Sequence, residues 1–339
     1  MTKILVKQMN NFSKFDEFEA KIWGNFLKRV SGFENVPILG ILRVVSLPIT
    51  LFSCLISGLL ASLYGLFDWD LFLVCSFGLL LAHAASNIFN DLWDYKNKID
   101  LPDYFRNVYG VHPVYLLGER KTWILGFFVS ILAFFCGFYL FLERGIFVLV
   151  LAVLGFIFLF SYSGPPFKFK YKGLGELVVF LVWGPLMIAG GFWVITSKIN
   201  PEVIILSFPY GITASLILFG KHLDKIKEDE KKGVKTLPVI LGEEKTKNLC
   251  KILVLLPYLF VVLGILLTKK WGLIFTFLSF PRALRIFNAI ALPKPSSENE
   301  LPEFYPRQFW PMWYVGGAFI FNTDFALSYI IALAVSHFF

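Results

Sequence analysis

The sequence predicts an all-α protein, a polytopic membrane bundle of about nine transmembrane helices. The first observation is composition: 57% of the 339 residues are hydrophobic, only 17% are charged, and the mean hydropathy is +0.67. Soluble domains carry about 25% charged residues, so a water-soluble core does not account for this excess. The second observation is that the apolar residues form continuous runs without the alternation of membrane strands, which favours helices over a barrel.

Nine of these runs are long enough to cross a bilayer, since about 20 helical residues span about 30 Å of hydrocarbon. The predicted spans are residues 41–66, 70–90, 123–142, 146–163, 174–195, 203–220, 249–267, 271–290 and 311–337. The first forty residues are polar and of mixed charge, so no cleavable signal peptide is expected. Cys54, Cys75, Cys136 and Cys250 fall in or beside spans without metal-binding spacing, and we expect them to pack in apolar surroundings.

The chain divides into a cytoplasmic N-terminal segment, residues 1–40, and a transmembrane domain, residues 41–339. Residues 15–30 place apolar side chains at three- and four-residue spacings with lysines among them. This pattern predicts an amphipathic helix at the membrane interface. A soluble helix packed on the cytoplasmic loops would show the same pattern, and the sequence leaves both open.

Basic residues follow the predicted topology. Of the 32 Lys and Arg residues, 28 fall on the side that contains the N-terminus, and the exceptions are Arg144, Lys198, Lys269 and Lys270. Because loops rich in Lys and Arg remain in the cytoplasm, this face is predicted to be cytoplasmic. Topology therefore explains the net charge of +8 without nucleic acid binding, and anionic lipid headgroups and an anionic substrate are the expected partners.

Polar side chains follow one face of the second span at its cytoplasmic end. At 100° per residue, this face carries His83, Asn87, Asn90, Asp91 and Asp94. Ionisable groups at membrane depth normally face a cavity and mark a site, and oxygen ligands of this kind suit Mg²⁺. The alternative is that the aspartates begin a solvated loop, but a helix exit has no reason to align the asparagines. We expect His83 to be a hydrogen-bonded core histidine.

A second acidic cluster follows the sixth span, where Lys221 precedes Asp224, Glu228 and Asp229. Asp224 and Glu228 are spaced one helical turn apart. Two acidic groups from separate helices can hold metal ions between them, while nearby ammonium groups neutralise diphosphate oxygens. Alone, this cluster would be interpreted as a solvated helix extension. Together with the first cluster it predicts a diphosphate site.

Basic residues next to the membrane are further candidates. Arg43 precedes the first span, and Lys168, Lys170 and Lys172 follow the fourth. Topology alone predicts juxtamembrane basic residues. Arg43 and Lys168 are the stronger candidates for contacts with a diphosphate.

The two acidic clusters resemble the motifs of the UbiA superfamily of intramembrane prenyltransferases. The motifs read Asn87-x3-Asp91-x2-Asp94-x5-Asp100 and Asp224-x3-Glu228-Asp229, the second followed by GVKTLPVILG. Residues 162–185 (YSGPPFKFKYKGLGELVVFLVWGP) resemble the menaquinone-type branch, in which 1,4-dihydroxy-2-naphthoate is prenylated.

The resemblance implies nine helices around a central cavity, with Mg²⁺ bridging both motifs to a polyprenyl diphosphate. It assigns metal binding to Asn87, Asp91, Asp94, Asp224 and either Glu228 or Asp229. The predicted diphosphate contacts are Arg43, Asn87, Asn90, Lys168 and Lys221. The predicted catalytic residues are Asp91, Asp94, Asp224 and Asp229.

The predicted function is Mg²⁺-dependent transfer of a polyprenyl group to an aromatic acceptor such as 1,4-dihydroxy-2-naphthoate. Metal and lysines would stabilise charge on the leaving diphosphate, and the acceptor would attack the allylic cation. Glu228 stands where the family usually has aspartate, and Lys221 where the menaquinone branch has asparagine. These departures leave another aromatic acceptor or a lipid alcohol open. The rival classes are a cation transporter and a membrane phosphotransferase, whose Asp-Gly-x2-Ala-Arg signature is absent.

Overall fold

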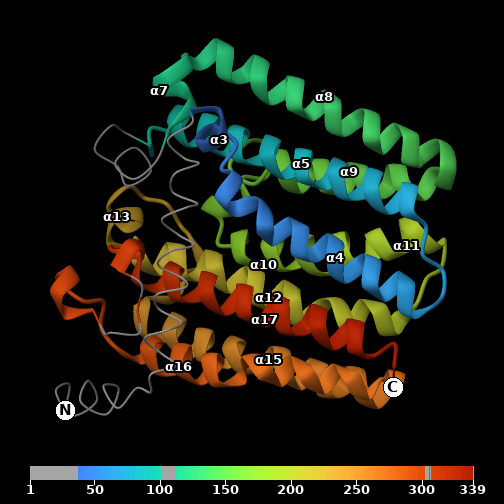
Figure 1. Ribbon diagram of the computed structural model, residues 1–339. Helices are drawn as coiled ribbons and strands as arrows, with labels where there is room; N and C mark the ends of the chain where they lie inside the picture. Colours follow the sequence, from blue (N-terminus) through green and yellow to red (C-terminus); the bar gives the residue numbers. More distant parts are fainter. Residues whose placement is uncertain (1–36, 101–110, 302–304, 306, 339) are drawn as a thin grey trace.

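The computed structural model describes residues 37–100, 111–301, 305 and 307–338, and every named element in these ranges is a helix (Figure 1). The predicted all-α fold is therefore confirmed. The amphipathic helix predicted for residues 15–30 lies outside the described residues.

The long helices coincide with the predicted spans to within a few residues. In the described part of the chain, eight helical segments are long and apolar enough to cross a membrane. They are η1 with α4 (Val44–Leu63), α5 (Trp69–Lys96), α8 (Glu119–Arg144), α10 to α11 (Gly175–Thr196), α12 (Pro201–Asp224), α15 (Glu243–Thr268), η4 with α16 (Trp271–Ala291) and α17 (Trp313–Val335). The remaining predicted span is the shorter apolar helix α9 (Ile146–Phe160).

Short helices lie at the ends of these spans that carry the two acidic clusters. They are α3 (Pro37–Ile41), η1 (Val44–Ser46), α7 (Pro113–Leu117), η2 (Phe169–Tyr171), α13 (Ile226–Lys231), α14 (Leu237–Leu241), η5 (Glu298–Glu300) and η6 (Arg307–Phe309). Several of them carry or flank the polar residues of the two predicted motifs.

Two spans depart from a regular α-helix. The fifth predicted span, residues 174–195, runs through α10 (Gly175–Leu181), the π-helix η3 (Val182–Ala189) and α11 (Gly190–Thr196). Pro185 lies inside η3 and lacks a backbone N–H, so regular hydrogen bonding cannot continue there. The eighth predicted span, residues 271–290, begins as the 3-10 helix η4 (Trp271–Ser279) before α16 (Phe280–Ala291). Hydrophobicity alone does not distinguish these helix types.

The helices α12 and α17 form the centre of the bundle. In Figure 1, α8 lies at one edge, α15 and α16 lie at the other, and α12 and α17 lie between them. The buried hydroxyl of Tyr210 donates to the carbonyl of Ile49 (2.6 Å), and that of Tyr329 donates to the carbonyl of Leu206 (2.8 Å). Polar groups inside a membrane protein need such internal partners, because lipid offers none.

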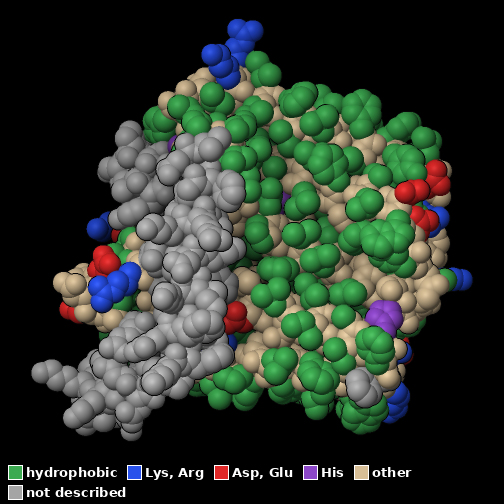
Figure 2. Space-filling view, in the orientation of Figure 1, with side chains coloured by type: hydrophobic (Ala, Val, Ile, Leu, Met, Phe, Trp, Pro, Cys, Tyr) green, Lys and Arg blue, Asp and Glu red, His purple; other side chains and the backbone are tan. Residues whose placement is uncertain are grey.

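The outer surface of the bundle is apolar, as lipid-facing helices require. Exposed aromatic side chains on α8 include Phe127, Phe134 and Phe138. Figure 2 shows hydrophobic side chains over the described face, with charged side chains mostly at the two ends of the helices. The chain is therefore an integral, multi-pass membrane protein.

The packing of α12 against α17 gives a first testable prediction. A Cβ atom added at Gly220 would lie 2.7 Å from backbone atoms of Tyr314 and Val315. We expect Gly220→Ala to push the helices apart and to lower the free energy of unfolding by about 1–3 kcal/mol, the usual cost of overpacking. The melting temperature of the detergent-solubilised protein measures this effect. Gly137→Ala is the control, since a Cβ there meets no atom within 4 Å; equal melting temperatures would contradict the close packing.

Candidate active site

An apolar cavity lies between α5, α8, α9, η3 and α12. Its volume is about 810 Å³, and most of its lining side chains are apolar. The polar side chains that line it include Arg43, Asn87, Asn90, Tyr162 and Lys221. They belong to the ends of the helices that carry the two predicted acidic clusters, so the polar end of the cavity adjoins both clusters.

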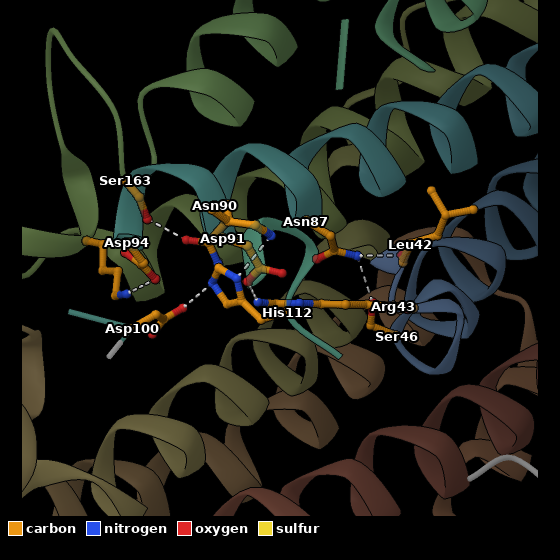
Figure 3. Close-up of polar contacts among 12 residues, drawn as sticks. Leu42, Arg43, Ser46, Asn87, Asn90, Asp91, Asp94, Asp100, His112 and Ser163 are labelled. Carbon is orange, nitrogen blue, oxygen red and sulfur yellow. Dashed lines mark hydrogen bonds and ion pairs between the residues drawn. The ribbon is translucent and has the colours of Figure 1, made fainter. Parts of the chain in front are cut away.

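The first acidic cluster lies on a continuous helix. Because α5 extends to Lys96, Asn87, Asn90, Asp91 and Asp94 remain on one helical face, as the sequence predicts. The aspartates Asp91 and Asp94 are 0% and 4% exposed. Figure 3 shows that Asp100, from the turn after α5, lies near them, and it is buried as well. Buried carboxylates require compensating charges.

Basic side chains from two other segments supply these charges. Arg43, which precedes η1 in a left-handed conformation (φ 50°), forms an ion pair with Asp91. The Nζ atom of Lys170 lies 2.6 Å from Oδ2 of Asp94, and the hydroxyl of Tyr171 donates to Oδ1 of Asp94 (2.5 Å). The carboxylates of α5 therefore join the segment before α4 to the loop after α9.

The loop after α9 folds back to bring Lys170 into the site. The backbone N–H of Lys170 donates to the carbonyl of Tyr162 (2.9 Å). Burial would lower the pKa of Lys170, but the negative charges of Asp94 and Asp100 outweigh it, so its pKa is raised. The ammonium group therefore stays charged at neutral pH.

The sequence favours Lys168 over Lys170 for a diphosphate contact, and the structure places the two differently. Lys168 has a positive φ of 51°, and its ammonium donates to Oδ1 of Asn97 (3.4 Å). Lys170 is instead the lysine that reaches Asp94. Residue spacing in an irregular loop does not reveal which side chain turns inward.

The asparagines of α5 contact the same two segments as the aspartates. The amide of Asn87 donates to the carbonyl of Leu42 (3.2 Å) and to the hydroxyl of Ser46 (3.1 Å). The hydroxyl of Ser163 donates to Oδ1 of Asn90. The polar face of α5 is therefore fixed along its length by neighbouring segments (Figure 3).

His112 is a site residue that sequence reasoning missed. It lies beside the carboxylates, with donor atoms of Asp91, Asp100 and His112 all within 4.8 Å of one another. The N–H of Val114 donates to Nδ1 of His112 (3.3 Å), which leaves the ring proton on Nε2, 3.3 Å from Oδ2 of Asp100. The imidazole thus presents a proton to the cluster, and the carboxylates are the ligands suited to a cation. No spacing rule connects His112 to the motif.

A break in the helix divides the second acidic cluster. The helix α12 ends at Asp224, and Lys225 (φ −120°, ψ 16°) separates it from α13. Asp224 and Glu228 therefore do not share a continuous helix, contrary to the prediction. The carboxylate of Asp224 accepts hydrogen bonds from the N–H groups of Tyr314 (3.1 Å) and Val315 (2.9 Å), in the first turn of α17.

The three acids of this cluster consequently have different surroundings. Asp224 caps α17 and lies 3.4 Å from Nζ of Lys294. Glu228 is exposed, whereas Asp229 is buried and interacts electrostatically with Lys170. Of the two alternatives that the sequence leaves open, Asp229 is the one that lies beside the first cluster.

Two lysines of the same segment face the site. Lys221 lines the cavity, and Lys225 is only 7% exposed. Lys225 interacts electrostatically with Asp229, Asp100 and Asp94. Burial nevertheless lowers its pKa, so a bound anion would stabilise its charged form.

One wall of the cavity is polar. Nδ1 of His83 lies 2.8 Å from the hydroxyl of Thr50, which also accepts the indole N–H of Trp183 (3.0 Å). Nε2 of His83 lies 3.4 Å from the hydroxyl of Ser46, and the rings of His83 and Trp183 meet edge to face. His83 is packed and hydrogen bonded, as expected, but it also lines the cavity.

The carboxylates of the first cluster suit a hard divalent cation. Mg²⁺ usually binds one or two carboxylates together with substrate phosphates and water. Asp91 and Asp100 place carboxylate oxygens within 4.8 Å of each other, and Asp94 is a third buried carboxylate, one turn of α5 from Asp91. These three aspartates are the residues best placed to hold Mg²⁺ next to the cavity.

Comparisons with known proteins agree with this geometry. A profile of the UbiA prenyltransferase family matches residues 50–322. The chain is 26% identical over 251 residues to the 1,4-dihydroxy-2-naphthoate octaprenyltransferase of Bacillus subtilis, which covers 73% of this chain and 78% of that protein. It is 29% identical over 250 residues to the 2-carboxy-1,4-naphthoquinone phytyltransferase of Synechocystis sp., with the same two coverages.

A solved structure has the same fold. The structure of a UbiA homolog from Archaeoglobus fulgidus bound to GPP and Mg²⁺ superposes with a TM-score of 0.59 at 14% identity. The superposition covers 88% of this chain and 100% of that chain. At this level of identity the likeness establishes the shared arrangement of helices.

The contacts of Asp224 lead to a second prediction. We expect Asp224→Ala to lower the free energy of unfolding by about 1–2 kcal/mol in metal-free buffer, because two N–H groups of α17 lose their acceptor. Thermal unfolding in detergent with EDTA measures the change. Glu230→Ala, an exposed acid on α13, is the control. A melting temperature that stays constant or rises for Asp224→Ala would indicate a metal ligand rather than a cap.

Proposed function

This chain belongs to the UbiA prenyltransferase family, and we propose that it transfers a prenyl group from an allylic polyprenyl diphosphate to an aromatic acceptor with the help of Mg²⁺. The proposed acceptor class follows the two relatives described above, a 1,4-dihydroxy-2-naphthoate octaprenyltransferase and a 2-carboxy-1,4-naphthoquinone phytyltransferase. Within that class, 1,4-dihydroxy-2-naphthoate is the acceptor to test first.

The observation that carries the proposal is the combination of an apolar cavity with a buried ionic site at its end. The apolar part, about 810 Å³ in volume, suits a hydrocarbon chain. Arg43 and Lys221 line the polar end, and the carboxylates of Asp91 and Asp94 lie beside it. A molecule with a long apolar tail and an anionic head matches both parts.

The charged groups have separate roles in this proposal. We assign Mg²⁺ to Asp91, Asp94 and Asp100, because Asp91 and Asp100 place oxygens within 4.8 Å of each other and Asp94 is a buried carboxylate one turn of α5 from Asp91. When bound, Mg²⁺ would neutralise negative charge that develops on the departing diphosphate. Arg43 and Lys170 supply further positive charge from the protein itself.

We leave two of the predicted metal ligands out of the proposed metal site. The carboxylate of Asp224 is engaged by α17, and Glu228 points to solvent. Asp229 remains as the acid of the second motif beside the site. The amides of Asn87 and Asn90 stay in the proposal as polar groups at the cavity mouth.

The cavity walls protect the reacting carbon. An allylic cation is captured by water unless the site excludes it, and the apolar lining serves that purpose. Trp183 and Tyr162 both line the cavity with aromatic rings. The face of an aromatic ring attracts a nearby cation, so these residues are placed to stabilise the prenyl cation.

The polar wall at His83 supports an aromatic acceptor. His83 and Trp183 line the cavity, and both are hydrogen bonded to the buried hydroxyl of Thr50 behind them. A few polar groups in an apolar pocket usually fix the orientation of a ligand, and a hydroxylated ring offers matching hydrogen bonds. A lipid alcohol is the alternative acceptor, since its single hydroxyl could use the same wall.

We also propose that the site faces the cytoplasm. The ends of α5 and α12 that carry the acidic residues adjoin the loops rich in Lys and Arg. Such loops remain on the cytoplasmic side of a membrane protein. Anionic lipid headgroups at that surface are expected partners of the same residues.

The first test of the function is prenyl transfer by the purified protein in liposomes. With Mg²⁺ and radiolabelled allylic diphosphates, we expect transfer to 1,4-dihydroxy-2-naphthoate, and we expect EDTA to abolish it. Asp91→Ala and Asp94→Ala should reduce kcat by at least about a hundredfold, since each removes a proposed metal ligand. Glu230→Ala should retain wild-type activity. Transfer that is unaffected by EDTA or by both aspartate variants would refute the proposed metal site.

The polar wall gives a prediction about the acceptor. We expect His83→Ala to raise the KM for the acceptor roughly two- to tenfold, the value of one neutral hydrogen bond, with the KM for the prenyl diphosphate unchanged. Ser130→Ala is the control, because Ser130 also lines the cavity but bonds to its own helix through the carbonyl of Gly126. A KM for the acceptor that is the same in both variants would exclude His83 from acceptor binding.

A further inference from the structure

We propose that the α12–α13 side of the site binds the diphosphate directly through Lys221 and Lys225, and that a single divalent cation binds on the α5 side. This inference rests on the proposed function and specifies how its charged substrate is held. It adds Lys225 to Lys221, which the sequence already predicts as a diphosphate contact, and it removes the second acidic motif from the proposed metal site.

The α12–α13 side contributes one buried carboxylate to the site. Asp224 turns to the first turn of α17, where it accepts two backbone hydrogen bonds. Glu228 is exposed to solvent. Of the three acids that the motif contains, Asp229 is thus the one that is buried beside the site.

Lys221 and Lys225 precede Asp229 at intervals of four residues. The N–H of Asp229 donates to the carbonyl of Lys225 (2.8 Å), so one helical turn separates these residues. Lys225 therefore occupies the position four residues before Asp229, which in an Asp-x3-Asp pair would carry the other acid. Lys221 lies a further four residues back and lines the cavity. Both lysines interact electrostatically with Asp94 of the first cluster.

The α5 side of the site accommodates a divalent cation better than the α12–α13 side does. From α12 and α13, a divalent ion at Asp229 would receive one carboxylate ligand, and the ammonium group of Lys225 one helical turn away would repel it. On the α5 side, Asp91 and Asp100 place oxygens within 4.8 Å of each other, and Asp94 adds a third buried carboxylate. The cation therefore belongs to α5. An ammonium group is a compact charge well suited to phosphate oxygens, so the lysines belong to the diphosphate.

The stoichiometry of metal binding tests this division. The protein in detergent is titrated with Mn²⁺ in the presence of geranyl thiodiphosphate, a prenyl diphosphate analogue that resists ionisation, and bound Mn²⁺ is counted by EPR. We expect one Mn²⁺ per chain. Lys225→Asp should bind two, because it places a carboxylate four residues before Asp229 and so creates a pair of carboxylates. Lys227→Asp makes the same charge change at an exposed position of α13 and should still bind one.

Two Mn²⁺ ions per wild-type chain would overturn the inference while leaving the proposed function intact. No bound Mn²⁺, together with no Mg²⁺-dependent prenyl transfer, would overturn the proposed function and this inference with it. The two failures are therefore distinguishable.

Binding of the analogue without metal is a second measurement, which does not require Lys225→Asp to fold. In EDTA, we expect the wild-type protein to bind geranyl thiodiphosphate, and we expect Lys225→Gln to raise the Kd roughly ten- to a hundredfold, the value of a hydrogen bond to a charged group. Lys227→Gln should leave the Kd unchanged. Equal Kd values for the two glutamine variants would overturn the direct contact.

Discussion

The pairing of buried charges at the polar end of the cavity is the constraint on which the site depends. Asp91 and Asp94 belong to a membrane span, where an unpaired charge is costly. Each is paired with a cation from a different segment, Arg43 from before α4 and Lys170 from the loop after α9. Because these partners are fixed to the helices that enclose the cavity, the same interactions align the ionic site with the apolar cavity.

The termination of α12 sets a second constraint. The first N–H groups of a helix lack partners within that helix, and those of α17 receive them from Asp224. A carboxylate engaged in this way no longer turns toward the first cluster. The helix break at Lys225 then separates Asp224 from Asp229, and Lys225 and Asp229 interact electrostatically with charged groups beside α5, so the local helix geometry decides which charges of the motif enter the site.

Much of the fold is predictable because lipid imposes a strong rule on sequence. Each predicted span overlaps a helix, and the polar stripe of α5 could be placed on one face, since a continuous helix preserves a 100° spacing. That spacing fails for Asp224 and Glu228, because Lys225 interrupts the helix. A helical spacing also does not predict the positions of Lys170 and His112, which reach the carboxylates from short segments between the spans. Their positions depend on the folding of loops, for which no periodic signal exists.

The acidic and basic residues of the site cannot be interpreted separately. Among the residues that the structure describes, Arg43, Lys170, Lys221 and Lys225 each interact electrostatically with one or more of Asp91, Asp94, Asp100 and Asp229. Removing one member of a buried pair leaves the other uncompensated, which costs more than the pair contributes. The number of metal ions that such a site can hold therefore depends on its lysines as much as on its aspartates. A motif identified by its acids alone describes only half of this balance.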